Sequence, residues 1–153
     1  MNGAEVFRLL VADGDAKMRQ LVRANLSVIG FEVLEARDAW ECLRMAWREK
    51  PDMIILDLDL PDHTGWEVIS LMDLSGKLID VEIIVTSGDT PSPVVLQKYG
   101  ATDFAKKPYD IRCLMHQVER AAGLRRARSA NQHRRGSSEG IRAKVTRNAD
   151  GRI

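Results

Sequence analysis

Short apolar runs alternate with amphipathic stretches along most of the chain, and this alternation restricts the fold more than any single residue does. The apolar runs lie at residues 7–12, 31–36, 53–57, 81–87 and 102–105, and each stops at polar or turn-forming residues. Between and after them, apolar residues recur at helical spacing. No two neighbouring runs are joined by a hairpin turn signal. The pattern therefore predicts parallel strands in one sheet, with helices on both faces.

The predicted fold class is α/β, a flavodoxin-like doubly wound sheet of five parallel strands in the order 2-1-3-4-5. Right-handed crossovers leave few other topologies for such a chain. In this order the first and third strands flank the point where the strand order reverses, and ligands of open α/β sheets bind in the crevice there. Asp13 follows the first strand and Asp57 ends the third, so we expect the two carboxylates to meet.

Residues at the helix boundaries agree with this division of the chain. Asp15 and Asp38 each stand directly before a helical pattern, where a carboxylate can cap the first backbone N–H groups. Pro91 and Pro93 follow the fourth strand and postpone the next helix, because proline has no N–H group for a helix interior. We therefore expect only a short helix there, over residues 94–99.

Charge divides the chain into two parts. Residues 124–153 carry nine Arg and Lys residues against two acidic ones, a charge of +7, which leaves −6 for the rest of a chain whose total is +1. A length of 153 residues suits one well-packed domain, which we place at residues 6–123. The basic tail at 124–153 has too few large apolar residues to offset the entropy of ordering, so we predict that it is largely disordered after its first turns.

The basic tail and the N-terminus bear on partners and location. A run of arginines is most often a solvated segment, and the alternative is contact with nucleic acid, an acidic protein or a membrane surface. No apolar run approaches the length that crosses a bilayer, so we expect no membrane span. The N-terminus lacks the basic and then apolar stretch of a secretory signal, which predicts a cytoplasmic location.

Two more polar side chains belong to the crevice that Asp13 and Asp57 define. Thr86 lies near the end of the fourth strand, and Lys107 follows the fifth. A phosphoryl group on an aspartate needs a metal ion for its charge, a hydroxyl group for one oxygen and an ammonium group for another. The crevice offers carboxylates for a metal, a hydroxyl group and an ammonium group, so its residue types suit a phosphoryl group on Asp57.

Four short motifs stand in order at the predicted strand ends. They are the acidic loop Asp13-Gly14-Asp15, the block Asp57-Leu58-Asp59-Leu60-Pro61 with Gly65, the pair Thr86-Ser87, and the stretch Gly100-Ala101 with Asp103-Phe104 that leads to Lys106-Lys107-Pro108-Tyr109. Each motif alone is weak. Together they resemble the receiver domain of response regulators in two-component signalling, in its single-domain form, over residues 6–123.

This resemblance implies a phosphoryl-transfer role for the crevice. Asp57 would accept a phosphoryl group from the phosphohistidine of a histidine kinase or of a phosphotransfer protein, as a signalling switch rather than an enzyme. Thr86 and Lys107 would each bind a phosphoryl oxygen, and the rotamer of Phe104 would follow the movement of Thr86. The resemblance also implies a downstream protein partner, which we expect at the face around residues 88–109.

The resemblance further implies a Mg²⁺ cofactor, held by Asp13, Asp57 and the backbone carbonyl of Asp59. The family usually ends its first strand with two adjacent acids, but the second position here is Gly14. Asp15 is one residue further on and is expected to cap the following helix. Because Mg²⁺ can keep several waters, the remaining oxygen ligands still predict a site, with weakened affinity.

Two alternative functions compete with this one. The missing acid at Gly14 also fits a receiver-like module that binds partners without being phosphorylated. A haloacid-dehalogenase-type phosphatase likewise has an Asp-x-Asp motif after an apolar strand, as at Asp57 and Asp59, and Thr and Lys residues later in the chain. That family carries its motif on the first strand and needs a further acidic motif after the Lys, whereas Pro61 and Gly65 fit the receiver motif.

Overall fold

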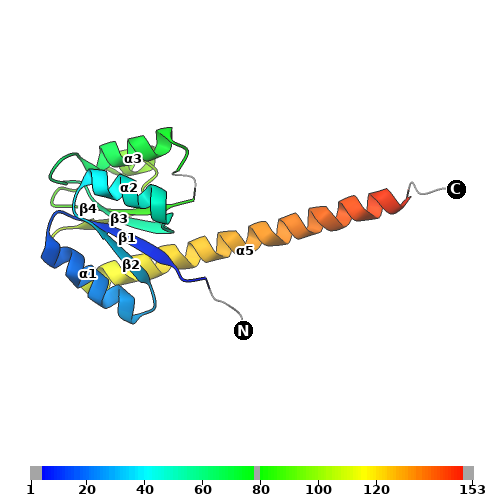
Figure 1. The fold of residues 1–153 in the computed structure, drawn as a ribbon, viewed down its shortest axis with the longest axis horizontal. Coiled ribbons are helices and arrows are strands. Elements are labelled where there is room, and N and C mark those ends of the chain that lie inside the picture. Colours follow the sequence, from blue (N-terminus) through cyan, green and yellow to red (C-terminus); the bar gives the residue numbers. More distant parts are fainter. Residues whose placement is uncertain (1–4, 78–79, 150–153) are drawn as a thin grey trace.

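A five-stranded parallel sheet forms the centre of the molecule (Figure 1). The computed structural model describes residues 5–77 and 80–149. Along the chain the elements are β1 (Arg8–Ala12), α1 (Ala16–Val28), β2 (Glu32–Ala36), α2 (Ala39–Glu49), β3 (Met53–Asp57), α3 (Gly65–Leu74), β4 (Glu82–Ser87), α4 (Pro93–Lys98), β5 (Asp103–Lys106) and α5 (Ile111–Ala149). The strand order is β2-β1-β3-β4-β5 and every neighbouring pair is parallel, which confirms the predicted fold class.

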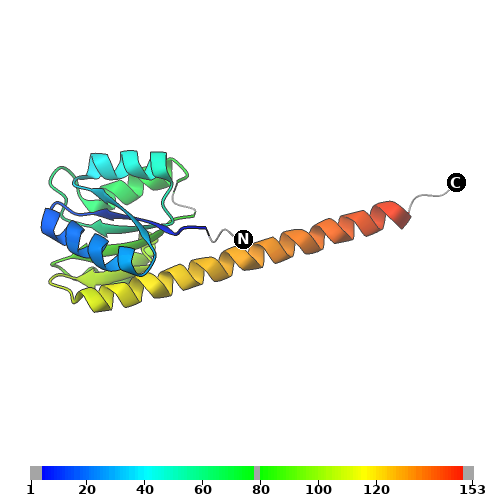
Figure 2. The same cartoon turned by 60° about the horizontal axis from the view of Figure 1, so that its bottom comes forward.

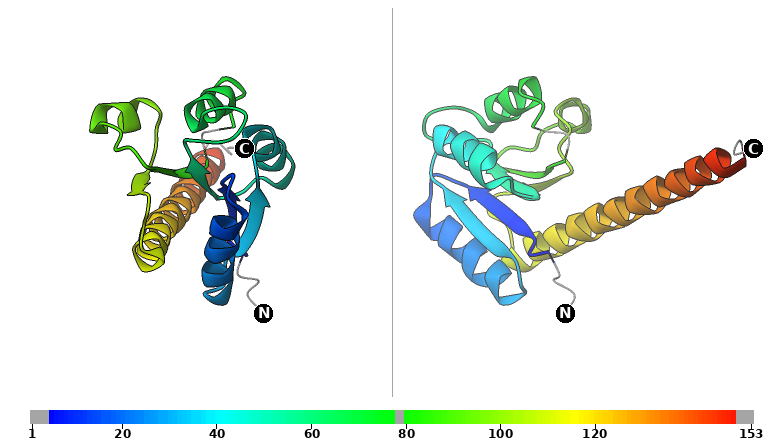
Figure 3. Two further views of the ribbon diagram at one scale, coloured as in Figure 1. Left: turned by 90° about the vertical axis from the view of Figure 1, so that its left-hand side faces the viewer. Right: turned by 45° about the vertical axis from the view of Figure 1, so that its right-hand side comes forward.

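Helices cover both faces of the sheet (Figure 2 and Figure 3). Successive residues of a strand point to opposite faces. Leu9 therefore packs with residues of α1 and α5, while its neighbour Leu10 packs with residues of α2 and α3. Both leucines are fully buried. Because each face of the sheet is covered, the central strands β1, β3 and β4 appear in the sequence as largely apolar runs, whereas the edge strands β2 and β5 also contain charged residues.

The predicted helix caps at Asp15 and Asp38 are confirmed. The Asp15 carboxylate accepts a hydrogen bond from the N–H of Lys17 at 2.9 Å, and the Asp38 carboxylate accepts one from the N–H of Glu41 at 2.7 Å. Each bond satisfies an N–H group that no helical carbonyl can reach, and such a cap typically contributes about 1 kcal/mol. Helices α1 and α2 are thus fixed where they begin, next to the carboxyl ends of β1 and β2.

Helix α4 is short, as the prolines predict. It has six residues, Pro93–Lys98, and none of them is buried. Ser92 caps it, and its first position is a proline, where the missing N–H group costs no hydrogen bond. Tyr99, directly after the helix, stacks on Trp66 of α3 with 4.6 Å between the ring centroids. An aromatic pair therefore holds one end of a helix that has no buried side chain.

Helix α5 continues far beyond the domain, which differs from the prediction of a disordered tail at residues 124–153. It has 39 residues, Ile111–Ala149, and its second half projects from the amino edge of the sheet (Figure 1 and Figure 2). Arg125 and Arg128 form ion pairs with carboxylates of the domain, which hold the first turns of this part in place. Arginine and alanine are also strong helix formers. Residues 150–153 of the predicted tail lie outside the described residues.

The length of α5 does not give it the character of a membrane helix. A bilayer requires about 20 consecutive apolar residues, whereas the second half of α5 is rich in arginine. Within residues 5–77 and 80–149, no helix is both long enough and apolar enough to cross a membrane.

Candidate functional site

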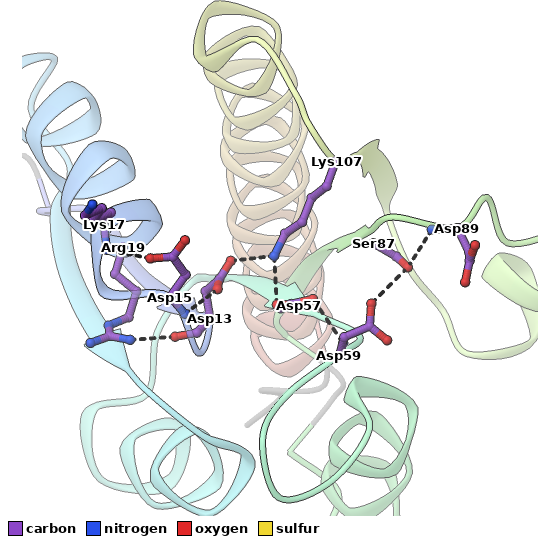
Figure 4. Close-up of polar contacts among 9 residues, drawn as sticks. All are labelled: Asp13, Asp15, Lys17, Arg19, Asp57, Asp59, Ser87, Asp89 and Lys107. Carbon is purple, nitrogen blue, oxygen red and sulfur yellow. Dashed lines mark hydrogen bonds and ion pairs between the residues drawn. The ribbon is translucent and has the colours of Figure 1, made fainter.

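The carboxyl ends of β1, β3 and β5 bring two aspartates and one lysine together (Figure 4). Asp13 directly follows β1, Asp57 is the last residue of β3, and Lys107 directly follows β5. Asp13 and Asp57 are each only 4% exposed. Three of the residues that the sequence analysis assigned to the crevice therefore do meet in space.

Lys107 forms ion pairs with both aspartates. Its Nζ atom lies 2.8 Å from Oδ2 of Asp13 and 2.8 Å from Oδ2 of Asp57. Burial by itself lowers the pKa of Lys107, but the hydrogen bonds and charges of the two carboxylates outweigh it and raise that pKa above its ordinary value. Burial and the charge of Asp13 likewise raise the pKa of Tyr109 to about 12. Two buried carboxylates that repel each other thus share one cation.

Backbone N–H groups fix the other oxygen of each carboxylate. Oδ1 of Asp13 accepts a hydrogen bond from the N–H of Asp15 at 2.8 Å. Oδ1 of Asp57 accepts one from the N–H of Asp59 at 3.0 Å. An ionised carboxylate has enough lone pairs to bind a backbone donor on one oxygen and Lys107 on the other. Both side chains are therefore held with Oδ2 toward the same point in the crevice.

The turn after Asp57 depends on a glycine at position 65. A Cβ atom on Gly65 would lie 2.7 Å from the carbonyl oxygen of Asp57 and 3.0 Å from Cα of Leu58. Backbone atoms leave no space for a side chain at those distances. The N–H of Gly65 also donates to the carbonyl oxygen of Leu58 at 3.0 Å. The glycine thus lets the start of α3 pack against the end of β3, and this packing places the loop with Asp59 at the crevice.

Thr86 and Phe104 lie beside the crevice, on β4 and β5. Thr86 is the partner of Asp57 in the ladder between β3 and β4, and it is fully buried. Phe104 is the partner of Val85 in the next ladder and packs, half-buried, against the core between the sheet and α2 and α3. Both residues therefore lie on the strands to which the sequence analysis assigned them. A coupled movement of their side chains stays a prediction.

The crevice offers a divalent cation the carboxylates of Asp13 and Asp57, and a role of the Asp59 backbone carbonyl stays a prediction. The carboxylate of Asp15 caps α1 instead, and that of Asp59 turns toward Ser87, whose Oγ lies 3.5 Å away (Figure 4). Among the described residues, no three His, Cys, Asp or Glu side chains gather as a metal centre. Mg²⁺ often binds through one or two carboxylates and completes its shell with water, so Asp13 and Asp57 provide the minimum that this ion needs.

Arg19 also belongs to the site, and the sequence analysis missed it. Its Nη1 donates to the carbonyl oxygen of Asp13 at 2.7 Å, and its Nε lies 3.4 Å from the carboxylate of Glu35 on β2. The loop between β1 and α1 contains Gly14, which leaves the backbone less restricted, so this bond helps to hold Asp13 in place. A signal was available, because Arg19 lies four residues after the cap Asp15, one helical turn from the loop.

Comparisons with known proteins agree with this geometry. A family model described as "Response regulator receiver domain" matches residues 9–119. The chain is 30% identical over 121 residues to the response regulator MprA of Mycobacterium leprae (strain TN), covering 79% of this chain and 52% of that protein. It is 31% identical over 123 residues to the alkaline phosphatase synthesis transcriptional regulatory protein PhoP of Bacillus subtilis (strain 168), covering 80% and 50%. The chain thus spans about half the length of these curated relatives.

Solved structures show the same fold. The chemotaxis protein CheY4 of Vibrio cholerae aligns with a TM-score of 0.69 and 28% identity, over 76% of this chain and 98% of that chain. A CheY-like receiver domain protein of Methanospirillum hungatei aligns with a TM-score of 0.73 and 23% identity, over 81% and 99%. In both cases nearly the whole of the other chain aligns with part of this one.

Proposed function

Because the chain belongs to the response regulator receiver domain family of two-component signalling, we propose that Asp57 is its phosphoacceptor. The donor in this proposal is the phosphohistidine of a histidine kinase or of a phosphotransfer protein. The observation that carries it is the double ion pair of Lys107 with Asp13 and Asp57. A buried carboxylate beside an ammonium group has the surroundings that a transferred phosphoryl group needs. Receiver domains are in general signalling domains, so the product is a phosphorylated switch.

In the proposed transfer, Oδ2 of Asp57 attacks the phosphorus atom of the donor. The bond between phosphorus and the imidazole nitrogen breaks as the bond between phosphorus and Oδ2 forms, and the donor nitrogen keeps the electron pair. Oδ1 stays on the N–H of Asp59, which holds the carboxylate in its orientation. Nζ of Lys107 exchanges Oδ2 for a phosphoryl oxygen, and the hydroxyl group of Thr86 donates to another.

Magnesium is the cofactor of this proposal. Asp13, Asp57 and the carbonyl oxygen of Asp59 would hold the ion, which supplies positive charge next to the phosphoryl oxygens when it is bound. Asp13 is positioned for this role by Arg19, which binds its carbonyl oxygen. When Asp13 holds the metal ion, its ion pair with Lys107 would break, and the ammonium group and the carboxylate would separate.

The downstream partner is proposed to bind the face around residues 88–109. This face contains α4, which has no buried residue and is held by the stack of Tyr99 on Trp66. Weakly held segments shift at small energetic cost, and in this proposal a movement of Thr86, near the end of β4, biases this one.

A second candidate is a receiver-like module that binds its partner without being phosphorylated. Gly14 favours it, because the loop after β1 lacks one of the two acids that the family usually has there. The haloacid-dehalogenase alternative loses its support. Its nucleophile would lie on the first strand, whereas Asp57 ends β3 in a chain that matches the receiver family.

Incubation with acetyl phosphate and Mg²⁺, followed by intact-mass measurement, tests the proposal. We expect the gain of one phosphoryl group, its loss in Asp57→Asn, and its retention in the control Asp89→Asn, which removes an exposed carboxylate beyond the end of β4. A mass that never changes would support the phosphorylation-independent module. A phosphoryl group that persists in Asp57→Asn would place the acceptor elsewhere.

A further inference from the structure

Residues 124–149 form the α5 extension, the part of α5 that lies beyond the domain. It leaves the domain at the amino edge of the sheet, whereas Asp13, Asp57 and Lys107 lie at the carboxyl edge (Figure 1 and Figure 3). At 1.5 Å per residue, residues 124–149 extend over about 39 Å. The phosphoacceptor function proposed above uses none of its residues, so the α5 extension is a surface without an assigned role.

The α5 extension is strongly basic. It carries eight Arg and Lys residues against a single acidic one, Glu139. Between Glu119 and Glu139 the chain contains no acidic residue. Each residue of an α-helix is turned by about 100° from the one before it. Arg126 therefore lies about 100° and Arg134 about 180° around the helix axis from Arg125, so positive charge lies on several sides of the helix. Such a helix attracts anions.

Contacts with the domain hold the first turns of the α5 extension. Arg125 pairs with Asp52 at 3.1 Å and donates to the carbonyl oxygen of Asp80. Arg128 pairs with Glu82, a buried carboxylate at the start of β4. Asp52 and Glu82 both lie at the amino edge of the sheet. The helix is therefore directed away from the acidic crevice rather than over it.

Apolar residues on the α5 extension are too few for a lipid surface or a protein groove. Leu124, Ile141 and Val145 are its only large apolar residues. Leu124 stands nearly five helical turns before Ile141, so the helix has no continuous apolar stripe. Membrane-surface helices and helices that dock in protein grooves both need such a stripe. We therefore infer that the α5 extension recognises a partner by charge rather than by apolar contact.

We propose that the α5 extension binds double-stranded DNA through its phosphate groups. Arginine matches the geometry of phosphate oxygens, and the counterions that it displaces from DNA drive binding. An α-helix fits the major groove of B-form DNA, which is about 12 Å wide, whereas the major groove of double-stranded RNA is too narrow for side chains to read. Binding of this kind is independent of sequence, because every sequence has the same phosphates.

Fluorescence anisotropy with the full chain tests this proposal. The probe is a labelled DNA duplex of about 20 base pairs, titrated at NaCl concentrations from about 50 to 200 mM. We expect binding at the lowest salt and an affinity that falls steeply as salt rises. Each phosphate that the protein contacts contributes roughly 0.9 to the slope of log K against log [NaCl].

Two double variants separate local contact from net charge. Arg134→Gln with Arg135→Gln removes two cations from the α5 extension, and Arg44→Gln with Arg48→Gln removes two from the exposed surface of α2. If both α5 arginines contact phosphates, the first variant lowers the salt slope by about 1.8 and weakens binding at low salt. The α2 variant has the same net charge and should keep the slope of the original chain.

Three results would overturn the DNA proposal. The first is no change in anisotropy at the lowest salt. The second is an equal loss in both double variants, which would reduce the effect to net charge. The third is competition by polyglutamate as strong as that by unlabelled DNA, which would identify an acidic polypeptide as the partner. The measurement uses unphosphorylated protein, so its result is independent of the intact-mass experiment on Asp57.

Discussion

Nζ of Lys107 lies 2.8 Å from Oδ2 of Asp13, although 94 positions separate the two residues in the chain. The same ammonium group binds Asp57 at 2.8 Å, so one cation neutralises part of a buried acidic pair. A divalent cation that binds these carboxylates has to compete with Lys107. The affinity of the crevice for a metal ion therefore depends on the lysine as well as on the aspartates.

Removing that ammonium group should tighten metal binding. In Lys107→Met the two carboxylates lose their counter-charge, and we expect the Mg²⁺ affinity to rise by about tenfold. Phosphorylation by acetyl phosphate should fall, because no ammonium group binds the phosphoryl oxygens. Isothermal titration calorimetry measures the first effect and intact mass the second. The control is Lys106→Met, an exposed neighbour. An unchanged Mg²⁺ affinity in Lys107→Met would show that the ion does not bind these carboxylates.

Restoring an acid after β1 should strengthen the metal site. Gly14→Asp adds a carboxylate beside Asp13, and we expect Mg²⁺ to bind roughly 10- to 100-fold more tightly. A Cβ atom at this position would lie 3.0 Å from Cγ of Pro61, so the proline ring has to move slightly. We expect a loss of roughly 1 kcal/mol in the free energy of unfolding.

Gly14→Asn separates the two effects of that substitution. It has nearly the same shape as Gly14→Asp but no charge, so it should lose stability without gaining metal affinity. Mg²⁺ titration followed by the fluorescence of Trp66, at the start of α3, compares the variants. Equal titration curves for Gly14→Asp and the original chain would sink the idea that the missing acid weakens the site.

Activation should alter the segment from Thr86 to Tyr109 more than any other. Helix α4 in this segment has no buried residue, so little free energy opposes its movement. Hydrogen exchange with and without beryllofluoride, a phosphoryl mimic, should differ most in residues 86–109. Tyr99→Ala, which removes the stack on Trp66, should speed the exchange of α4 in both states. An exchange difference confined to α1 would contradict the assignment of this face.

The buried thiol of Cys42 should make stability depend on pH above about 9. Burial, with smaller contributions from Asp38 and Asp62, raises the pKa of Cys42 from 9.0 to about 12. An unfolded chain then loses the thiol proton at a pH where the folded chain still keeps it. The unfolded state binds fewer protons in this range, so the free energy of unfolding falls as pH rises from about 9 to about 12.

Urea unfolding at about pH 8 and pH 10.5 checks this effect. Cys42→Ala lacks the titrating group, so its stability loss between the two pH values should be smaller by about 2 kcal/mol. Cys113→Ala removes an exposed thiol and should follow the original chain. The same pH-dependent loss in Cys42→Ala and the original chain would refute the assignment to Cys42.

The fold class and the residues at the strand ends follow from the sequence by itself. Strands buried on both faces must be largely apolar, so β1, β3 and β4 were visible as apolar runs, while the edge strands β2 and β5 mix apolar with charged residues. The rule of right-handed crossovers then left few strand orders. Once β1, β3 and β5 have their places in the sheet, their carboxyl ends share one edge. The sequence therefore predicts that Asp13, Asp57 and Lys107 lie together.

Only the tertiary structure decided how these side chains face one another and how far α5 extends. Lys107 reaches both carboxylates, and the Asp59 carboxylate turns toward Ser87 instead of the crevice. The ion pairs of Arg125 and Arg128 hold the first turns after the domain, and α5 continues from them into residues for which apolar content predicted disorder. In each case the deciding partner comes from a distant part of the chain. Side-chain direction and helix continuation depend on distances through space, which a local sequence pattern does not contain.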